Sequence, residues 1–440
     1  MSVLAAPAGF TANIDALWLM ICAAMVLLMT PGLAFFYGGM VRAKSVINMM
    51  MMSFGAIALI SVLWVLYGYS MSFGVQSGSG RIRDWLIPHW LLNPFGNAGL
   101  QDFLPIHSDG SISALNAGDT YSLAFAGFEA TFAIITVALI SGAIADRAKF
   151  GAWMIFAGVW ATVVYFPVAS WVFDVTRGPV GTVVDGGWLA RLGLSDFAGG
   201  TVVEINSGAA ALALALVLGR RIGFTKGMAK PHNVPLTLIG AALLWFGWFG
   251  FNSGSALAVN TASALAWVNT LATPAAATIG WLLTEKLKDG KPTSIGAASG
   301  AVSGLVAITP GGNVLTPGWA LVLGLVAGVV CCLAVELKWR LGFDDSLDVV
   351  GIHLVGGLIG TLFIGFFGAG IGLVDTGSFR QLGVQLLGSL AVGAYSFAVA
   401  YGIGSALQKT IGFRITSEDE SAGVDNVLHG EESYAFDPAF

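Results

Sequence analysis

Charged residues are scarce in this 440-residue chain, where Asp, Glu, Lys and Arg together make up only 10% of the sequence. Ordinary soluble domains carry about 25% charged residues. Hydrophobic residues reach 56%, and there are 60 glycines. This composition excludes an ordinary soluble enzyme and is typical of a helical membrane protein with many spans, where glycine permits close helix packing. The net charge of −5, without a polybasic run, argues against a nucleic-acid partner.

Cysteine and histidine are also rare, and their positions exclude several chemistries. The cysteines Cys22, Cys331 and Cys332 lie in apolar stretches without a CxxC motif, so neither a disulfide framework nor a zinc site is expected. Only His353 lies well inside an apolar run, which excludes a b-type haem held by two histidines. The phosphate-binding pattern GxxxxGK(S/T) does not occur. We therefore expect no cofactor, no metal and no enzymatic activity.

Long apolar runs dominate the rest of the chain. A transmembrane helix needs about 20 predominantly apolar residues, and eleven runs qualify, the eighth being short and rich in small residues. They predict an all-α polytopic membrane protein. The expected spans are Ala16–Phe36, Val46–Phe73, Tyr121–Ile144, Phe150–Phe173, Phe197–Leu218, Val234–Gly254, Ala256–Leu283, Ile295–Ile308, Ala320–Leu341, Val349–Phe367 and Leu382–Leu407.

The placement of basic residues supports an odd number of spans. With the N-terminus outside, fifteen of the 20 Lys and Arg residues fall in inner loops, as the positive-inside rule requires. Residues 1–15 lack the basic start of a signal peptide and would be extracellular, 16–407 would form the transmembrane domain, and 408–440 a cytoplasmic tail. The expected inner residues are Arg42, Lys44, Arg147, Lys149, Arg220, Arg221, Lys226, Lys230, Lys286, Lys288, Lys291, Lys338, Arg340, Lys409 and Arg414.

Ionisable residues inside the expected spans are few. A charge at the centre of a membrane helix costs about 2.5–3.5 kcal/mol on insertion scales, so such residues are functional candidates by default. They are Glu129, Glu204 and His353, with the acids Asp196 and Asp348 at helix starts. No basic residue in the helix of Glu204 could neutralise its charge. A purely structural role is therefore a weaker explanation for Glu204 than for a lone histidine such as His353.

An internal repeat relates the fifth and tenth spans. Asp196 precedes Glu204 by eight residues, and Asp345 precedes His353 by eight. Spans five apart cross the membrane in opposite directions, as an inverted five-plus-five repeat would produce, and such repeats place a site near the midplane. We therefore expect Glu204 and His353 to face each other. For the two aspartates, capping of free helix N–H groups is the preferred interpretation.

Several segments resemble those of a known family. The signature helix of the ammonium transporter (Amt/MEP/Rh) family closely resembles DFAGGTVVEINSGAAALALALVLGRR. Other family segments resemble PGLAFFYGGMVRAKSV, FEATFAIITVALISGAIADR, WFGWFGFNSGSA and DDSLDVVGIHLVGG, and the family's cytoplasmic tail resembles GVDNVLHGEESY. The match is collinear and covers nearly the whole chain.

The resemblance implies a homotrimer in the cell membrane. Each subunit would have its own hydrophobic pore between two inverted five-helix halves, with an eleventh helix on the outside. The substrate would be ammonium, or ammonia plus a proton. The tail would pack against inner loops and neighbouring subunits, and a cytoplasmic PII-type regulator is a candidate partner.

The same resemblance assigns residues to the pore. Phe132 and Phe251 match two stacked phenyl rings that close an outer vestibule, although either ring taken alone would more readily be a core or lipid-facing residue. Ser255 matches a serine that hydrogen-bonds the incoming ion, and His353 the second of two pore histidines. Asp196 matches the acid that orders the start of the fifth helix. Two further candidates lie in the same segments, Phe128 and Trp248.

Three positions depart from the family pattern. Glu204 stands where the first pore histidine is usual, as in some fungal members, so the titration belongs to a carboxylate–imidazole pair. Phe173 stands where a vestibule tryptophan is usual, which should weaken cation attraction there unless Trp171 substitutes. Glu129 replaces a glutamine one turn from Phe132, where it would concentrate cations at the mouth.

Two other functions remain open from the sequence. Some family members sense ammonium rather than carry flux; a kinase or cyclase domain would indicate that role, and we expect none here. A neutral gas or urea channel is the nearest alternative, and transport that follows ammonium without a response to urea would separate the two. The leading expectation is an ammonium transporter.

Overall fold

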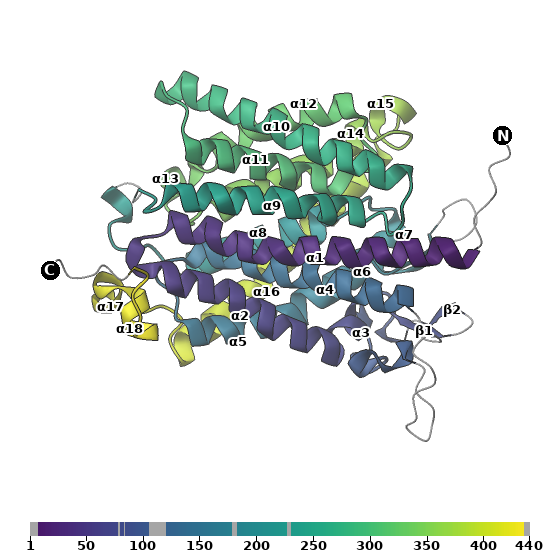
Figure 1. The fold of residues 1–440 in the computed structure, drawn as a ribbon, viewed down its shortest axis with the longest axis horizontal. Coiled ribbons are helices and arrows are strands. Elements are labelled where there is room, and N and C mark those ends of the chain that lie inside the picture. The colour runs from purple at the N-terminus through teal and green to yellow at the C-terminus, as the bar shows by residue number, and fades with distance from the viewer. Residues whose placement is uncertain are drawn as a thin grey trace.

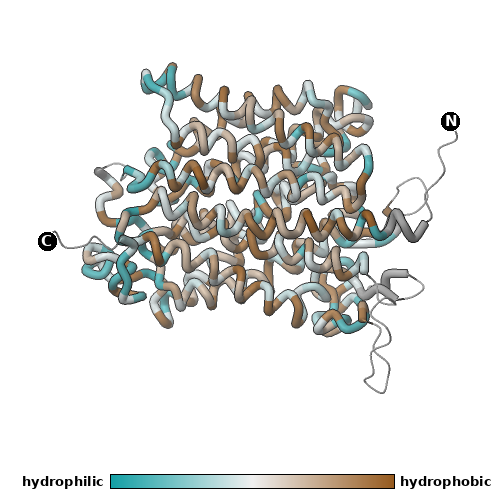
Figure 2. Tube along the Cα trace, viewed as in Figure 1, coloured by the Kyte–Doolittle hydropathy of each residue, from teal (hydrophilic) through white to brown (hydrophobic). Residues whose placement is uncertain are grey.

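The chain forms a bundle of long helices that lie side by side (Figure 1). The computed structural model describes residues 8–77, 80–82, 84–104, 120–177, 183–226 and 230–434. Helix α1 (Ala8–Met40) begins at one end of the bundle, and the tail helices α17 (Ser417–Ala422) and α18 (Val424–His429) lie at the other, here called the tail end. Hydrophobic residues dominate the middle and hydrophilic residues gather at both ends (Figure 2), as expected for helices that cross a bilayer core about 30 Å thick.

The other elements of the described residues are mostly helical, with three small two-stranded sheets. Within the same residues, four π-helical segments interrupt the helices: η2 (Trp64–Gly68), η6 (Ala161–Tyr165), η8 (Gly200–Ile205) and η11 (Val350–Leu354). The other helices are α2 (Val46–Leu63), α3 (Tyr69–Ser72), α4 (Thr120–Ile140), α5 (Phe150–Trp160), α6 (Phe166–Val172), α7 (Trp188–Leu192), α8 (Asn206–Leu218), α9 (Val234–Gly254), α10 (Thr261–Asp289), α11 (Ser294–Ile308), α12 (Pro317–Ala334), α13 (Leu337–Leu341), α14 (Val355–Phe367), α15 (Leu373–Thr376) and α16 (Arg380–Thr410). The antiparallel strand pairs are β1 (Val75–Ser77) with β2 (Gly80–Ile82), β3 (Trp85–Ile87) with β4 (Leu91–Leu92), and β5 (Val175–Arg177) with β6 (Val183–Gly186).

Ten helical segments in the described part of the chain are long and apolar enough to cross a membrane. Nine of them end close to the expected bounds, and the sixth expected span, Val234–Gly254, coincides with α9. The seventh expected span corresponds to α10, which is 29 residues long but is not among the ten. The multi-span helical fold is thus confirmed, and the status of α10 decides whether the spans number eleven.

Two helix starts differ from the expected ones for local reasons. Helix α1 begins at Ala8, inside the segment 1–15 that was expected to precede it, because the polar residues there do not break a helix. Helix α10 begins at Thr261 rather than Ala256. Asn260 accepts from the N–H of Ser263 (3.0 Å), and the Ser263 hydroxyl accepts from the N–H of Asn260 (3.0 Å). This capping box fixes the start of the helix.

A buried cluster of charges joins loops at the tail end. The fully buried guanidinium of Arg147 donates to the carbonyl of Asp344 (2.5 Å) and to the hydroxyl of Ser346 (2.5 Å). Arg221 donates from Nε to Asp344 Oδ2 (2.9 Å) and from Nη1 to Asp146 Oδ2 (3.1 Å). Hydrogen bonds from charged donors are about twice as strong as neutral ones. Three loops far apart in the sequence are therefore held together by two arginines.

Two neighbouring aspartates in this cluster have opposite pKa shifts. Burial alone would raise the pKa of Asp344, but the hydrogen bonds from Arg221 and the charge of Arg147 outweigh burial and hold this pKa below its ordinary value of 3.8. Burial raises the pKa of Asp345 to about 6, although the charge of Lys338 acts in the opposite direction. Asp344 therefore stays ionised near neutral pH, while Asp345 changes its charge close to it.

These shifts predict opposite effects when each charge is removed. Because the folded-state pKa of Asp345 is raised, its contribution to stability is fully present below about pH 3.8 and is lost as the pH rises through about 6. Asp345→Asn should therefore be stabilising relative to wild type at pH 8, by up to about 3 kcal/mol at roughly 1.4 kcal/mol per pKa unit. At pH 5, which lies between the ordinary pKa of 3.8 and the raised value of about 6, this gain should fall to about half. The measurement is the unfolding temperature in detergent at the two pH values.

Asp344→Asn is the matched control for that prediction. Because the folded-state pKa of Asp344 is lowered, its stabilising contribution is present at both pH 5 and pH 8 and is lost only as the pH falls through that pKa. Its replacement removes the carboxylate that accepts from Arg221 and whose charge lies beside the buried guanidinium of Arg147, so it should lower the unfolding temperature at both pH values. If Asp344→Asn and Asp345→Asn lowered the unfolding temperature equally at pH 8, the opposite pKa shifts of the two aspartates would be wrong.

The acidic tail folds back onto the tail end of the bundle. Asp425 accepts from the backbone N–H groups of Ile47 (3.0 Å) and Asn48 (2.8 Å), which are free donors at the start of α2. Glu420 is fully buried and accepts from the N–H of Ile222 (2.7 Å) and from Arg414 (2.9 Å). The tail thus packs against loops of the same chain. The outermost parts of the expected terminal segments, 1–7 and 435–440, lie outside the described residues.

Candidate functional site

Two π-helical segments carry the two ionisable candidates. Segment η8 contains Glu204 and continues into α8, and segment η11 contains His353 and continues into α14. Single π-helical turns are rare and concentrate at functional sites. The same local distortion at both positions agrees with the internal repeat expected from the sequence.

An aspartate caps the start of each of these segments. Asp196 accepts from the backbone N–H groups of residues 199–201 at 2.6–2.8 Å. Asp345 accepts from those of residues 349–350 at 3.1 and 2.7 Å. The first N–H groups of a helix have no partner within the helix, so the two carboxylates satisfy them. The capping interpretation of both aspartates is confirmed.

The two helices approach so closely that only glycine fits at the contact. A Cβ on Gly208 would lie 2.4 Å from the backbone nitrogen of Leu354. A Cβ on Gly357 would lie 2.8 Å from the Cβ of Glu204. Gly208 follows Glu204 by four residues, and Gly357 follows His353 by four. The contact is therefore reciprocal, and it brings the two ionisable side chains together.

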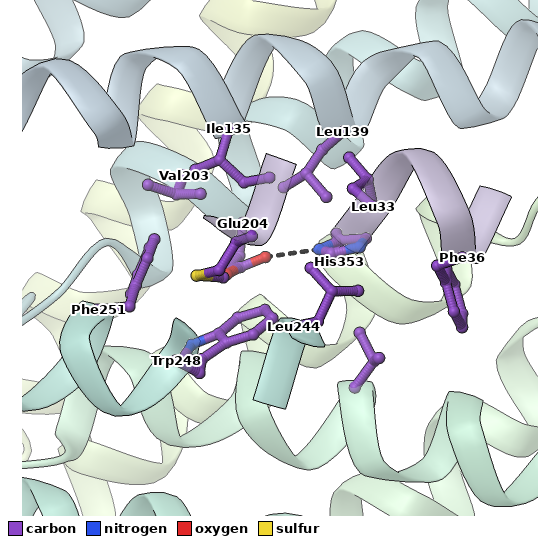
Figure 3. Close-up of a pocket in the computed structure, with 12 residues that line it drawn as sticks. Leu33, Phe36, Ile135, Leu139, Val203, Glu204, Leu244, Trp248, Phe251 and His353 are labelled. Atoms are coloured by element: carbon purple, nitrogen blue, oxygen red, sulfur yellow. Dashed lines mark hydrogen bonds and ion pairs between the residues drawn. The ribbon is translucent and has the colours of Figure 1, made fainter. Parts of the chain in front are cut away.

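Glu204 and His353 face each other, as the repeat predicted (Figure 3). His353 Nδ1 lies 2.6 Å from Glu204 Oε2, and the two residues are 4% and 0% exposed. At this distance one proton lies between the two atoms, bonded to either the imidazole or the carboxyl group. Glu204 Oε1 has no hydrogen-bond partner within the described part of the chain. It is therefore available as an acceptor for a donor that enters from the cavity.

A narrow apolar cavity surrounds this pair. Its volume of about 10 Å³ is close to the least space that holds one water molecule. In Figure 3 the labelled apolar side chains enclose Glu204 and His353 from several helices. Apart from Glu204 and His353, the cavity is lined by Met29, Leu33, Phe36, Ile135, Leu139, Val203, Leu244, Trp248, Phe251 and Val302. A hydrated ion would have to lose its water to enter such a space.

Two closely packed, tilted phenyl rings lie between the narrow cavity and a wider one. The ring centroids of Phe132 and Phe251 lie 4.1 Å apart, with 31° between the ring planes. Phe251 lines the narrow cavity and Phe132 lines the wider one. Phe128 packs edge-on against Phe132 at 4.8 Å, and Trp248 packs against Phe251 at 5.5 Å. We call Phe132 and Phe251 the phenyl gate.

The wider cavity, here called the vestibule, has a volume of about 860 Å³. Ser255, Glu129 and Phe173 line it, together with Phe132 of the phenyl gate. Ser255 donates its hydroxyl hydrogen to the carbonyl of Phe251 (2.8 Å), so its oxygen can accept from a cation that carries N–H groups. Glu129 is 8% exposed and adds a carboxyl group one turn from the gate. Asp196, the cap of η8, also lies in the vestibule wall.

Trp171 does not replace the tryptophan that is usual in the vestibule. Its indole N–H donates to the carbonyl of Trp90 (2.8 Å), and its ring packs 5.2 Å from Trp90 and 5.0 Å from Tyr395. Residues two apart on a helix point to different faces, so Phe173 reaches the vestibule while Trp171 points into an aromatic cluster beside it. The substitution considered from the sequence does not occur in this structure.

Sequence reasoning missed most of the narrow cavity's wall. Leu33, Phe36 and Leu139 line it, but each lies among other apolar residues of a long, mostly apolar helix, α1 or α4. Their sequence positions carry no signal that distinguishes a pore wall from a packed core, because both are built from the same residue types. The polar candidates were visible because charge is rare inside a span.

Comparison with known sequences identifies close relatives. A family model described as Ammonium Transporter Family matches residues 17–434. An ammonium transporter from Mycobacterium tuberculosis is 50% identical over 435 residues, covering 96% of this chain and 90% of that protein. The ammonium transporter Amt1 from Archaeoglobus fulgidus is 40% identical over 421 residues, covering 95% of this chain and 98% of that protein.

Comparison with solved structures agrees. A structure named Sensor Amt Protein matches with a TM-score of 0.83 and 28% identity, covering 96% of this chain and 99% of that one. The crystal structure of Saccharomyces cerevisiae Mep2 matches with a TM-score of 0.77 and 31% identity, covering 92% of this chain and 90% of that one. The curated relatives are transporters rather than enzymes. With a family model that spans nearly its whole length and relatives at 40–50% identity, the chain belongs to the ammonium transporter family.

Proposed function

We propose that ammonium crosses the membrane through the vestibule, the phenyl gate and the narrow cavity of each subunit. Family membership makes the chain an ammonium transporter, so the proposal concerns the route and its residues. The observation that carries it is the Glu204–His353 pair, which lies in a narrow apolar cavity directly behind two closely packed phenyl rings. The transported species is ammonium, or ammonia plus a proton.

The vestibule suits the capture of a small cation with N–H donors. Aromatic faces attract such a cation by up to about 2 kcal/mol when it is desolvated, and both Phe132 and Phe173 line the vestibule. The oxygen of Ser255 replaces one lost water. Glu129 raises the local concentration of cations through its negative charge. Potassium is attracted by the same charge, but it donates no hydrogen bond and has no proton to give up.

The narrow cavity suits the passage of neutral ammonia, with the proton of ammonium transferred separately. An isolated charge in an apolar space is very costly, and the usual escape is to lose the charge. Glu204 and His353 share a proton, either as carboxylate and imidazolium or as carboxylic acid and imidazole, and in both forms the pair is net neutral. Such a pair stays net neutral if it accepts a proton on one side in the same step in which it releases one on the other.

The proposal includes α10 as an eleventh span. Its polar residues face neighbouring helices and loops: Asn269 donates to the carbonyls of residues 312 and 315 (2.9 and 2.8 Å), and Thr270 accepts from Asn252 (2.9 Å). Its large apolar residues Leu271, Ile279 and Leu283 are 48%, 56% and 55% exposed. A helix with its polar side inward and its apolar side outward suits a bilayer, and its buried polar residues explain its lower mean hydropathy.

An odd number of spans places the two ends of the chain on opposite sides of the membrane. We propose that the N-terminus is outside and the C-terminus is cytoplasmic. A tag after Phe440 should then be labelled by a membrane-impermeant reagent only in opened cells. A tag inserted within residues 76–80 should be labelled in intact cells. Finding both tags on one side would remove the eleven-span arrangement.

Assembly and regulation follow the resemblance. We propose a homotrimer in the cell membrane and a PII-type regulator that binds at the cytoplasmic tail end. The similarity to the structure named Sensor Amt Protein favours ammonium sensing as a second candidate function. Measuring both uptake and the cell's transcriptional response to ammonium separates them: a variant that loses uptake but keeps the response would assign sensing to this chain.

A further inference from the structure

Trp248 connects the phenyl gate to the narrow cavity. Its side chain is 2% exposed, it lines the cavity, and it packs 5.5 Å from Phe251, the gate ring on the same side (Figure 3). The indole has one polar atom, the Nε1–H group, which can only donate. The direction of the Nε1–H group therefore determines whether the indole presents an apolar face or a hydrogen-bond donor to the pore.

The hydroxyl group of Thr309 holds this indole in place. Trp248 Nε1 donates to Thr309 Oγ1 at 2.9 Å, and Thr309 Oγ1 donates to the carbonyl of Leu305 at 2.8 Å. Thr309 is fully buried at the end of α11. Because the hydroxyl hydrogen is used on Leu305, a lone pair of the oxygen is directed at the indole, and the direction of both bonds is determined.

We infer that Thr309 is a positioning residue for selectivity, which acts by holding the indole of Trp248 against the phenyl gate. The inference rests on the pore proposed above. With both bonds formed, the indole cannot turn about its side-chain torsions without leaving a buried N–H unsatisfied, which is costly. The ring thus supports Phe251 from the cavity side, and its only donor is kept away from the passing ammonia.

Loss of the hydroxyl should loosen the gate without removing any pore-lining atom. In Thr309→Val the side chain keeps its shape but loses both hydrogen bonds. The indole can then rotate, and its N–H can draw water into a cavity that otherwise holds at most about one molecule. Water in this space provides hydration for potassium. Selectivity, rather than the rate of ammonium transport, is therefore the quantity that should change.

The test compares ammonium uptake and potassium leak in proteoliposomes. For Thr309→Val we expect the ratio of ammonium to potassium flux to fall about tenfold, the factor that corresponds to the loss of a hydrogen bond of about 1.4 kcal/mol. Thr309→Ser keeps the hydroxyl and should restore the ratio. Thr278→Val is the matched control, because Thr278 also donates to the carbonyl four residues earlier (Pro274, 2.9 Å) but lies on α10. It should behave as wild type.

Trp248→Phe removes the indole N–H that donates to Thr309, so it tests the same hydrogen bond even if Thr309→Val does not fold. It should also lower the ratio, and the double variant Trp248→Phe/Thr309→Val should be no worse than the more impaired single variant. Wild-type selectivity in either single variant, or additive losses in the double variant, would overturn the inference. Phe251→Ala distinguishes a wrong role for Thr309 from a wrong pore. If Phe251→Ala also leaves selectivity intact, the proposed route through the pore is wrong. If only Phe251→Ala lowers selectivity, the route stands and the role of Thr309 is wrong.

Discussion

Replacement of Glu204 by Gln should reduce ammonium transport by about a hundredfold, the lower end of what a positioned proton acceptor contributes. The amide fits the same space and can still accept a hydrogen bond from His353, which lies 2.6 Å from Glu204 Oε2. It cannot take up and release a proton near neutral pH. Glu204→His restores two imidazoles and should keep transport, with a changed pH profile.

The measurement is ammonium uptake and potassium leak for both variants between pH 5 and pH 8. Glu129→Gln is the matched control, because it is the same chemical change at an acid in the vestibule rather than the narrow cavity. It removes only an attractive charge, so it should weaken apparent affinity modestly and leave the maximal rate unchanged. If Glu204→Gln equals wild type in rate, selectivity and pH response, the carboxylate is a passive filler and the shared-proton account is wrong.

Removal of one ring of the phenyl gate should abolish most of the discrimination against potassium. Phe132 and Phe251 lie 4.1 Å apart and close the passage between two cavities. In Phe251→Ala the vestibule opens into the narrow cavity, water enters, and one aromatic face is lost. A cation–π contribution of about 2 kcal/mol corresponds to a roughly 30-fold change in selectivity. Phe132→Ala should act in the same direction.

Phe95→Ala is the control for the gate variants, because Phe95 is 75% exposed and lines neither cavity. It should leave flux and selectivity unchanged. Truncating a buried phenylalanine also costs about 3–5 kcal/mol of stability, so the unfolding temperature and the size of the purified particle must be compared among the variants. Equal, negligible effects of all three substitutions on transport would remove the gate from the route.

The central pair was predictable because it depends on features that a sequence displays. Ionisable residues are rare in spans, so Glu204 and His353 were visible, and the eight-residue spacing from Asp196 and Asp345 related their helices to each other. The reciprocal glycines and the π-helical turns then realise the contact in three dimensions. The position of the pair followed from composition and spacing, whereas the assignment of Phe132 as a gate residue came only from family resemblance.

Other features could not be predicted because they depend on which face of a helix is turned inward. Trp171 and Phe173 differ by two positions, and only Phe173 lines the vestibule. Arg147 was expected in an inner loop, where charges are usually solvated, yet it is fully buried by contacts from residues 344 and 346. Helix α10 is less apolar than its neighbours because Asn269 and Thr270 bond inside the protein. Each outcome depends on tertiary packing between distant segments.

Selective ammonium transport by this chain depends, in our proposal, on the Glu204–His353 pair, which accepts and releases the proton of ammonium. The most direct measurement is flux into proteoliposomes at pH 7 under equal gradients of ammonium and potassium, for wild type and Glu204→Gln side by side. The account predicts rapid ammonium flux and negligible potassium flux for wild type, with ammonium flux nearly lost in the variant. Equal fluxes of the two ions in wild type, or undiminished selective ammonium flux in Glu204→Gln, would contradict it.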